Sequence, residues 1–408
     1  MARRFLLPAP PLSRRHPRGT PVSDGMTVKQ MFDMTADLLS AGSNPTGTTA
    51  LGGSLPCPVY FVSHRYQNHA GPSGYDRFAD YLGESVTAPR WLDHLGRSVL
   101  RPMTKLVEWY NGSFEYSRHD CLREIATRLH MSGRQDAIYH FLYAEKSLRY
   151  LGPMNRRGGL RIIGSFHHCA FKYPTYFRST EHFRAIEHAV VVSRIQIEHM
   201  ESIVGPGKVS FVPYAVDASY FVPGERVSNR PLRCTCVGQH LRDFENLPAI
   251  IKALLSAERD LEFYVVGAPS KVRQSVEFDR VVWKQGISDA EYLDVLQQTD
   301  VLVLPLIDST SVTTVNEALG CGVPIVTNRG GVSDYLNDAC SIELTTGDVA
   351  GMVDATLALL RDDRRRQAMG LAARQQGLEL DWSRSAAKMA DVYRQVYDGM
   401  PRSESRGH

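Results

Sequence analysis

The stretch from Val301 to Gly331 combines an apolar strand, a hydroxyl-rich loop and a single acidic residue within an expected helix, at a spacing that could bind a phosphorylated ligand. The run Val301 to Leu306 has the length and β-branched content of a buried strand, and it ends at the polar residues Asp308 to Ser311. A helix is expected next, with Glu317 inside it. The unpaired amides at a helix start, together with the helix dipole, favour a phosphate.

The residues at this helix start are the candidates for phosphate contact. They are Ser309, Ser311, Val312, Thr313 and Thr314. Hydroxyl groups in such a run are expected at or near the N-cap, and Glu317, one turn further in, would accept hydrogen bonds from sugar hydroxyls. The alternative is an ordinary strand–helix unit with a capping Ser/Thr run and a solvated glutamate.

This stretch resembles the retaining glycosyltransferases of the GT-B architecture, which has two Rossmann-like domains, and in particular glycosyltransferase family 4. Those enzymes carry two glutamates eight positions apart, then a small-residue helix, a Gly-x-Pro strand and a Gly-Gly loop. The second glutamate matches Glu317, and the Gly-Gly pair matches Gly330 and Gly331. At the position of the first glutamate, which faces the donor sugar in the family, this chain has Ser309, with Asp308 just before it.

A second part of the resemblance lies in the loop that begins at Gly238, after an expected strand from Leu232 to Val237. In the family this loop carries an arginine and a lysine that hold the donor diphosphate. Arg242 matches the arginine, and a guanidinium can bind two phosphate oxygens at once. The lysine is not matched, because Glu245 and Asn246 stand near its place. A surface Arg242 paired with a neighbouring acid is the alternative.

In the first half of the chain, a histidine pair follows the expected strand Arg161 to Phe166. A histidine at this strand end resembles the family's cleft histidine, which lies close to the reacting sugar. His167 is the first choice for that role and His168 the alternative, and a hydrogen-bonded structural histidine is also open. A metal is not indicated, because no acid or cysteine stands at ligand spacing beside the pair.

The first expected strand, Cys57 to His64, leads through a glycine-containing loop into a helix from Tyr75 to Leu82. Strand, glycine loop and helix open a Rossmann-type domain, although the full Gly-x-Gly-x-x-Gly spacing is missing. The resemblance places this loop across the cleft from the donor. There, Gly71 and Gly74 would let the backbone approach a ligand closely. A plain turn is equally consistent.

The bulk composition is that of a two-domain globular α/β protein. The chain has 408 residues, of which 43% are hydrophobic and 22% charged. We expect two Rossmann-like domains facing across a cleft, joined by a hinge at about 214–230. The expected divisions are a disordered arm (1–54), an acceptor domain (55–215), a nucleotide-sugar donor domain (216–380), a helix crossing back to the first domain (381–398) and a disordered tail (399–408).

The net charge of +3 is unevenly distributed. Before residue 215 there are 26 Lys/Arg and 17 Asp/Glu, against 21 and 27 after it. The basic half could favour a membrane surface or an acidic acceptor, or could be an Arg-rich solvated surface. The segment Trp91 to Trp109 mixes basic and aromatic residues on a helical pattern that Pro102 is expected to break, which fits peripheral membrane contact or core packing. No apolar run is long enough to cross a bilayer.

Together these features predict a retaining, metal-independent glycosyltransferase with no cofactor. It would move a sugar from a nucleotide-diphosphate donor to a hydroxyl on a glycan, lipid-linked or small-molecule acceptor, in polysaccharide or glycoconjugate biosynthesis. Arg242, Glu317 and His167 would act directly. Two alternatives remain: a nucleotide-sugar hydrolase or epimerase, and a catalytically silent binding protein. The cysteines are odd in number and several lie in apolar stretches, which fits a reducing compartment. We therefore expect a cytoplasmic protein, possibly peripheral on the inner face of the membrane. The basic half lacks the clustered pattern of a nucleic-acid binder.

Overall fold

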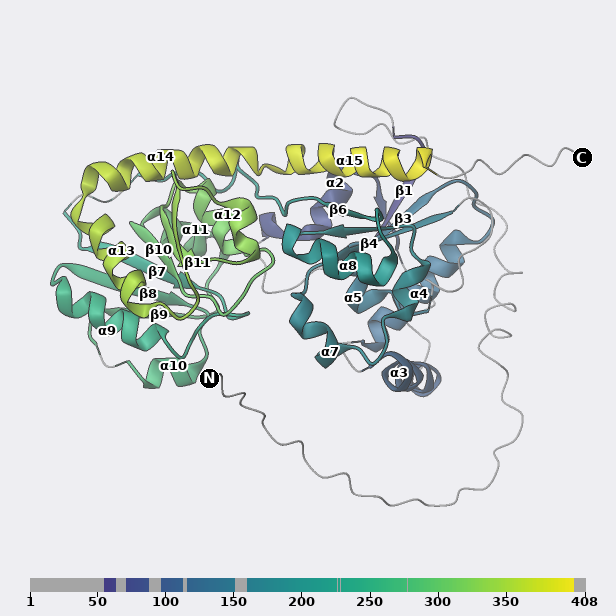
Figure 1. Cartoon of the computed structure of the whole chain (residues 1–408), viewed down its shortest axis with the longest axis horizontal. Helices are drawn as coiled ribbons and strands as arrows, with labels where there is room; N and C mark the ends of the chain where they lie inside the picture. Colours follow the sequence, from purple (N-terminus) through teal and green to yellow (C-terminus); the bar gives the residue numbers. More distant parts are fainter. Residues whose placement is uncertain are drawn as a thin grey trace, which may run out of the picture. The chain divides into compact units, whose positions relative to one another are not determined.

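The computed structural model describes residues 55–63, 71–87, 97–112, 116–150, 160–225, 227, 229–276 and 278–399. The arm expected over 1–54 lies outside these residues, as does the expected tail beyond residue 399. Within them the chain forms two parallel six-stranded sheets with helices packed on them (Figure 1), which confirms the predicted α/β class.

The first sheet has the strand order β2-β1-β3-β4-β5-β6, with every neighbouring pair parallel. Its strands are β1 (Val59–Val62), β2 (Glu84–Ser85), β3 (Ile138–Phe141), β4 (Arg161–Phe166), β5 (His188–Val191) and β6 (Val209–Phe211). The strands β1, β3, β4 and β5 are buried along their whole length. Parallel strands covered on both faces read as continuous apolar runs, which is why the sequence located most of them closely.

The second sheet has the order β12-β11-β10-β7-β8-β9, again with every neighbouring pair parallel. Its strands are β7 (Leu232–Val237), β8 (Leu261–Val266), β9 (Val281–Lys284), β10 (Val301–Leu304), β11 (Ile325–Asn328) and β12 (Ser341–Leu344). In chain order this is 3-2-1-4-5-6, the dinucleotide-binding arrangement. Its switch point lies between β7 and β10, so ligands are expected beyond the carboxyl ends of these two strands.

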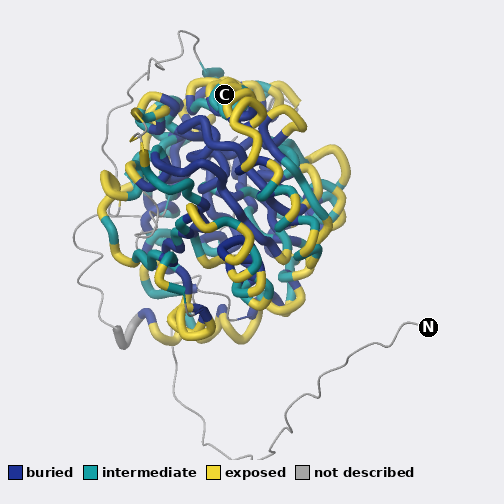
Figure 2. Tube along the Cα trace, turned by 90° about the vertical axis from the view of Figure 1, so that its left-hand side faces the viewer, coloured by how far each residue is buried: buried dark blue, intermediate teal, exposed yellow. Residues whose placement is uncertain are grey.

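Helices cover both sheets (Figure 1), and the buried residues lie in the interior of the molecule (Figure 2). Those of the first half are α2 (Phe78–Leu82), α3 (Arg97–Asn111), α4 (Arg118–Met131), α5 (Ala144–Ser147), α7 (Tyr173–Tyr176) and α8 (Ile197–Val204). Those of the second half are α9 (Leu247–Ala257), α10 (Ser270–Gln274), α11 (Asp289–Gln297), α12 (Thr313–Gly320), α13 (Val349–Arg361), α14 (Asp363–Glu379) and α15 (Trp382–Asp398).

Short 3-10 turns join several of these elements. They are η1 (Gly71–Ser73), η2 (Tyr75–Arg77), η4 (Ala170–Lys172), η5 (Glu181–Ala185), η6 (Arg194–Gln196) and η7 (Gly331–Tyr335). Ser193 and Ser288 each form a capping box at the start of a helix. Both caps therefore fix the angle at which the chain leaves a strand and enters a helix.

The helix α3 differs from the sequence expectation. Pro102 was expected to break it, but the helix runs through this residue from Arg97 to Asn111. A proline removes one main-chain hydrogen bond and crowds the carbonyl four residues earlier. Pro102 lies in the second turn on an exposed face, and the apolar side chains Leu100 and Val107 anchor the helix on either side of it. Within the described residues, no helix is long and apolar enough to cross a membrane.

The chain passes between the two sheets twice, at neighbouring places. Val216 donates its N–H to the carbonyl of Leu380 at 3.0 Å, and the two segments pair in parallel through Val216 and Asp381. The helix before this point, α14, lies along the second sheet, and the helix after it, α15, lies along the first (Figure 1). The side chain of Tyr393 on α15 bonds to His140 on β3 at 2.7 Å. The predicted helix crossing back to the first domain is therefore confirmed.

The predicted apolar role of the cysteines is also confirmed, because all seven are buried and unbridged. Burial raises the pKa of the Cys169 thiol to about 12, with a further rise from nearby Asp308. A thiol with so high a pKa is a poor nucleophile near neutral pH. The cysteines therefore serve as small core residues.

Candidate functional site

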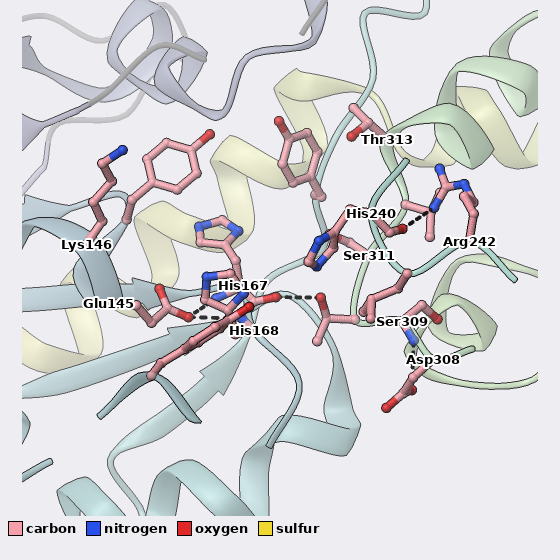
Figure 3. A pocket seen from close by; sticks show the side chains of 16 residues that line it. Glu145, Lys146, His167, His168, His240, Arg242, Asp308, Ser309, Ser311 and Thr313 are labelled. Carbon is pink, nitrogen blue, oxygen red and sulfur yellow. Dashed lines mark hydrogen bonds between the residues drawn. The ribbon is translucent and has the colours of Figure 1, made fainter. Parts of the chain in front are cut away.

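A cavity of about 470 Å³ lies between the carboxyl ends of the strands of the two sheets (Figure 3). Loops from the first sheet contribute the residues that follow β3, β4 and β6, which are Tyr143, Glu145, Lys146, His167, His168, Tyr176 and Tyr214. Loops from the second sheet contribute the residues after β7 and β10, which are His240, Leu241, Arg242 and the run Asp308–Thr313. Both β7 and β10 flank the switch point of the second sheet, as the topology requires.

His167 lies directly after β4 and lines the cavity. Its Nε2 is 2.7 Å from the carbonyl oxygen of Leu142, so Nε2 carries the hydrogen and donates it. The imidazole stacks on Tyr143, with centroids 4.7 Å apart, and meets Tyr75 edge-on at the same distance. These contacts fix both the tautomer and the plane of the ring. The predicted site residue is thus held rigidly, with its ring at the cavity wall.

Glu145 shapes the turn that carries both histidines. Its Oε1 accepts the main-chain N–H of His167 at 2.5 Å and that of His168 at 3.0 Å, and the side chain is almost fully buried at the cavity edge. Burial raises the pKa of this carboxyl, while the nearby His167 and the two amide hydrogen bonds oppose the rise. Glu145 therefore positions the histidine pair, and the sequence reasoning missed it.

His168, the alternative to His167, also lines the cavity. Its ring meets Tyr176 edge-on, with centroids 5.1 Å apart, and faces His240 of the other sheet at 6.2 Å. The two histidines that follow β4 thus point to different parts of the cavity (Figure 3). His167 lies among the aromatic rings at the centre, and His168 lies toward the loop after β7.

Arg242 lines the cavity from the second sheet, as predicted. Its Nε donates to the carbonyl of Val237 at 2.8 Å and its Nη1 to the carbonyl of His240 at 2.9 Å. A guanidinium has five N–H donors, so these two bonds orient it without exhausting it. Burial lowers the pKa of the Arg242 side chain, and the nearby Glu317 is among the groups that oppose this change.

Gly238 lies beneath Arg242 and does not itself line the cavity. Its φ is +91°, a left-handed conformation that favours glycine, and a Cβ there would come within 2.7 Å of the Arg242 Nη2 atom. The glycine therefore makes room for the guanidinium. Its predicted contact with a donor would be indirect, through the position of Arg242.

Ser309 lines the cavity at the end of β10, yet its hydroxyl is engaged in the protein. The Oγ accepts the main-chain N–H of Val332 at 3.0 Å, and the Ser309 carbonyl accepts that of Gly331 at 2.9 Å. Asp308, also in the wall, accepts the amide of Ser309 at 2.7 Å. The serine thus joins the loop after β10 to the Gly-Gly loop.

The start of α12 forms the upper wall, through Ser311, Val312 and Thr313. The sequence suggested a hydroxyl at or near the cap, but the N-cap residue is Val312, which makes no side-chain capping bond. The first amides of α12 are therefore not satisfied by a cap. A helix start of this kind presents its N–H groups and the positive end of its dipole to whatever fills the cavity. Thr314, one residue further, is buried and lies outside the lining.

Glu317 is predicted to contact a donor, but it does not line the cavity. It is buried in α12, where Oε1 accepts the hydroxyl of Ser73 at 2.6 Å and Oε2 accepts that of Tyr292 at 2.5 Å. Burial raises the pKa of the Glu317 carboxyl, and these two hydrogen bonds counteract part of the rise. The structure therefore brings Glu317 to Ser73 of the first domain, next to the cavity and not in its wall.

The two glycines predicted to face a ligand also lie outside the cavity wall. The amide of Gly71 donates to Asp289 Oδ2 of the second domain at 2.8 Å. Gly74 has an ordinary φ of −70°, and a Cβ there would collide with Asp76 of its own turn. Their role in this structure is to hold a tight turn that reaches the second domain.

Several cavity residues were not among the predicted site residues, including Tyr143, Lys146, His240 and Thr310. Lys146 follows β3, and loops after parallel strands gather at one edge, so its distance from a strand end could have drawn attention to it. The hydroxyl of Thr310 donates to the carbonyl of His167 at 2.6 Å, a contact that spans the two sheets. Among the residues that the structure describes, no three His, Cys, Asp or Glu side chains are grouped to hold a metal ion.

Comparison with known proteins finds similarities that centre on the second domain. Residues 232–362 match the family model "Glycosyl transferases group 1". A D-inositol 3-phosphate glycosyltransferase of Corynebacterium diphtheriae is 26% identical over 216 residues, which is 46% of this chain and 51% of that protein. The chain therefore spans about half the length of that curated relative. A GDP-mannose-dependent alpha-(1-6)-phosphatidylinositol monomannoside mannosyltransferase of Mycolicibacterium smegmatis is 27% identical over 66% of this chain and 79% of its own length.

Solved structures match the fold of the whole chain more widely. A glycosyltransferase from Rickettsia africae superposes with a TM-score of 0.60 at 13% identity, over 84% of this chain and 99% of that one. Sucrose-phosphate synthase from Thermosynechococcus elongatus gives a TM-score of 0.59 at 15% identity, over 78% of this chain and 83% of its own. At such identities the likeness concerns the fold, and it extends to both sheets.

Proposed function

We propose that the chain is a retaining glycosyltransferase of the GT-B, family 4-like kind, which uses a nucleotide-diphosphate sugar and a hydroxyl acceptor; the match of residues 232–362 to the glycosyl transferases group 1 model and the shared fold support this. The observation that carries the proposal is the uncapped start of α12 facing a cavity beside Arg242, within the matched region. Amides and a guanidinium that converge on one cavity form a site for a diphosphate.

The leaving diphosphate gains negative charge as the sugar departs, and this charge is what the site would stabilise. The amides at the start of α12 and the remaining donors of Arg242 are already oriented by the fold, so no reorganisation is needed during the reaction. On this reading a metal ion and a cofactor are not required. The ribose would lie toward Glu317, whose carboxylate can accept a sugar hydroxyl while it keeps the hydrogen bond from Ser73.

Retention would follow from attack on the same face of the sugar that the diphosphate leaves. A leaving phosphate oxygen would take the proton of the acceptor hydroxyl, while His167 supports the developing positive charge of the sugar from the opposite wall. The imidazole is held as the Nε2–H tautomer by Leu142, so it serves to position the sugar, and it is not the nucleophile. Closure of the two domains would exclude water, with which transfer competes.

The acceptor would enter from the first domain, which contributes Lys146, His168 and Tyr176 to the cavity. A glycan or a lipid-linked sugar offers the required hydroxyl.

For a lipid-linked acceptor we propose peripheral contact with the membrane through α3, whose residues Trp109 and Tyr110 are 67% and 66% exposed. Exposed aromatic side chains beside Arg101 and Lys105 suit the interface of an anionic bilayer.

A second candidate, a nucleotide-sugar-binding protein without transferase activity, rests on Ser309. The family has an acid at this position, whereas the hydroxyl here is bonded to the amide of Val332. Such a protein would bind nucleotide diphosphates tightly and turn over no donor. A hydrolase or epimerase would instead consume the donor without an acceptor.

The decisive experiment combines binding and turnover. UDP and GDP are titrated by calorimetry, and a panel of UDP- and GDP-sugars is incubated with and without a lipid or glycan fraction, with products followed by mass spectrometry. We expect acceptor-dependent product that persists in EDTA and has the donor's anomeric configuration by NMR. Tight nucleotide binding with no product would favour the binding protein, and product without acceptor would favour the hydrolase or epimerase.

Arg242→Ala tests the diphosphate site directly. Loss of a charged, pre-oriented donor should weaken UDP or GDP binding by about tenfold or more. Arg329→Ala, which removes an exposed arginine of the same domain, is the matched control and should bind like wild type. Wild-type affinity in Arg242→Ala would remove the central support for the proposal.

Membrane contact is tested separately by sedimentation with vesicles of neutral or anionic lipid. Trp109→Ser combined with Tyr110→Ser should reduce binding to anionic vesicles and leave nucleotide affinity unchanged. Leu371→Ser is the control, because Leu371 is an even more exposed apolar residue on α14. Equal binding by all three proteins would exclude α3 as the contact.

A further inference from the structure

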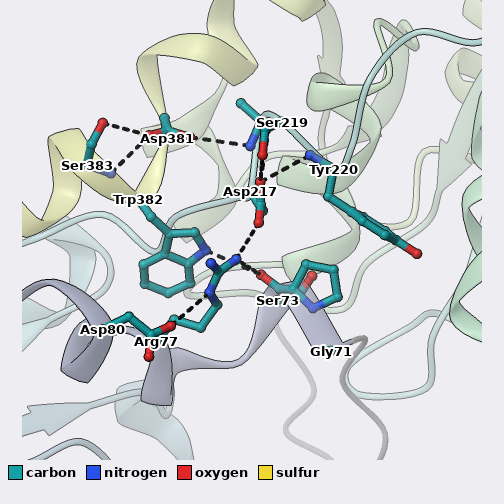
Figure 4. Close-up of polar contacts among 12 residues, drawn as sticks. Gly71, Ser73, Arg77, Asp80, Asp217, Ser219, Tyr220, Asp381, Trp382 and Ser383 are labelled. Carbon is teal, nitrogen blue, oxygen red and sulfur yellow. Dashed lines mark hydrogen bonds and ion pairs between the residues drawn. The ribbon is translucent and has the colours of Figure 1, made fainter.

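Residues 71–77, called the 71–77 turn below, contact parts of the molecule that are far apart in the sequence (Figure 4). The turn comprises η1 and η2. On one side it reaches two carboxylates of the second domain, and on the other it reaches both segments by which the chain passes between the sheets. None of its residues lines the cavity.

Arg77 makes the contact with the first crossing segment, which is the stretch around Val216 and Asp217. Its Nη1 donates both to Asp217 Oδ2 at 2.5 Å and to the carbonyl of Pro72 at 3.2 Å. One nitrogen therefore ties the crossing segment to the turn. The side chains of Arg77 and Asp217 are 22% and 18% exposed, so solvent weakens this ion pair only in part.

Asp217 is itself fixed in place. Its Oδ1 accepts the amides of Ser219 and Tyr220, each at 3.1 Å, and the hydroxyl of Ser219 at 2.6 Å. Burial raises the pKa of the Asp217 carboxyl, but the bonds from Ser219 and Arg77 outweigh this and hold the pKa below its usual range. The acid is thus ionised and rigid, and a movement of the crossing segment carries it along.

The second crossing segment, around Asp381 and Trp382, also contacts the carbonyl of Pro72. Trp382 Nε1 donates to the carbonyl of Pro72 at 3.4 Å, and Asp381 Oδ2 accepts the amide of Ala218 at 3.4 Å. Phe78, directly after the turn, packs edge-on against Trp382, with centroids 5.2 Å apart. Both crossing segments are therefore attached to the carbonyl of Pro72, one through Arg77 and one through Trp382.

The far side of the turn carries Ser73 and Gly71. The Ser73 hydroxyl donates to Glu317 Oε1 at 2.6 Å in a buried bond, and the Gly71 amide donates to Asp289 Oδ2 at 2.8 Å. Tyr214 also donates its hydroxyl to the carbonyl of Ser73 at 2.6 Å. Any shift of Pro72 must therefore displace the group that holds Glu317.

We propose that Arg77 is a positioning residue that connects the domain crossing to Glu317: its ion pair with Asp217 holds the 71–77 turn, and Ser73 at the far side of the turn sets the Glu317 carboxylate. Rotation of one domain on the other thereby changes how Glu317 is presented to a nucleotide. The link to nucleotide binding rests on the proposed function. The link between Arg77 and the turn does not.

The first test needs no nucleotide. Hydrogen–deuterium exchange is measured over residues 71–77 in wild type, Arg77→Gln and Arg384→Gln. Arg384 forms an exposed ion pair with Glu379 at the same crossing without touching the turn, so it is the matched control. We expect faster exchange of the Gly71 amide in Arg77→Gln, and wild-type exchange in Arg384→Gln. Unchanged exchange in Arg77→Gln, with the fold intact by circular dichroism, would overturn the proposal.

The second test is a double-variant cycle on the affinity for UDP and GDP. Arg77→Gln and Ser73→Ala should each weaken binding by about fivefold, because each removes one partly buried polar contact. The double variant should be no weaker than Ser73→Ala alone, because Arg77 acts through Ser73. Arg77→Lys, which keeps the charge, should recover part of the affinity.

The outcomes separate this inference from the proposed function. If the effects of Arg77→Gln and Ser73→Ala multiplied in the double variant, Arg77 would act by another route and the inference would fail. If wild type bound neither nucleotide, the proposed function would fail. The part of the inference that connects Arg77 to nucleotide binding through Glu317 would fail with it. The exchange rates would still decide whether Arg77 holds the turn.

Discussion

The two domains share an architecture and differ in what they bury. Each has six parallel strands covered by helices, but the first domain contains the buried imidazoles His140, His182 and His188. The second domain has one histidine among its described residues, His240, and it lies in the cavity wall. The polar groups buried in the second domain are mainly hydroxyls, amides and carboxylates. Among the described residues, one parallel sheet therefore buries imidazoles that the unfolded chain would protonate near neutrality, and the other buries none.

The largest expected consequence is that acid unfolds the first domain before the second. Burial lowers the pKa of His140 and His182 to about 3 and that of His188 to about 4. Below about pH 6.5, the pKa of histidine in the unfolded chain, these histidines are protonated in the unfolded chain but stay neutral in the folded domain. Stability is thus fully present above that pH and is lost as the pH falls, by up to about 1.4 kcal/mol per pH unit for each group.

Urea unfolding at pH 7 and pH 5, resolved by domain through hydrogen exchange, measures this difference. His188→Asn should reduce the pH dependence in the first domain and leave the second unchanged. Equal acid sensitivity of the two domains would contradict the comparison.

Next in size is the difference between the two neighbouring cavity histidines. His167 is clamped by Leu142 and Tyr143, whereas His168 faces the loop of the second domain. We expect His167→Ala to lower donor turnover by more than tenfold, and His168→Ala to change mainly KM for the acceptor. Steady-state kinetics with both variants decides between them. Unchanged activity in His167→Ala with loss in His168→Ala would move the role by one residue.

A smaller effect is expected at Ser309, where the second domain uses a hydroxyl that does not titrate. Ser309→Ala leaves the buried amide of Val332 without its acceptor, which should lower the free energy of unfolding by about 1 kcal/mol. Chemical denaturation at pH 5 and pH 8 measures the loss, which should be the same at both values. Ser309→Thr, which keeps the hydroxyl, is the control. A loss that changed with pH would show that a titrating group is involved.

The smallest expected effect concerns the pH at which nucleotide binding weakens. Burial raises the pKa of Glu317, while Ser73 and Tyr292 donate to the carboxylate, Arg242 opposes the rise and Asp289 adds to it. Binding that needs the carboxylate should therefore weaken as the pH falls through a value above the usual range for glutamate. Tyr292→Phe removes one donor to the charged carboxylate and should move that midpoint upward. Calorimetry between pH 4 and pH 8 tests this, and a downward shift would contradict it.

The positions of the main strands could be predicted well from the sequence, because buried parallel strands are continuous apolar runs. Leu232–Val237 and Arg161–Phe166 were located to the residue. Arg242, His167 and the start of α12 were also placed at the correct strand ends, since those ends converge in any such sheet. The prediction there depended only on which residues follow which strand.

The contacts between domains could not be predicted in the same way. Glu317 bonds to Ser73, 244 positions earlier, and no local pattern specifies that meeting. Glu145 was missed because its role is to bind the main-chain amides of His167 and His168, which any residue type provides. The cap of α12 was misjudged because a hydroxyl run suggests capping, whereas the fold places Val312 at the N-cap.

The helix α15 has a consequence for how the protein is made. Its residues Trp382 and Tyr393 complete the core of the first domain, where Tyr393 bonds to His140 and Trp382 packs against Phe78. During synthesis, α15 leaves the ribosome only after the entire second domain. The surface of the first domain that α15 covers therefore stays exposed until α15 has been synthesised. The second domain can fold at once, because its strands and helices are contiguous in the chain. We expect nascent chains that stop before residue 381 to expose that apolar face and to recruit chaperones.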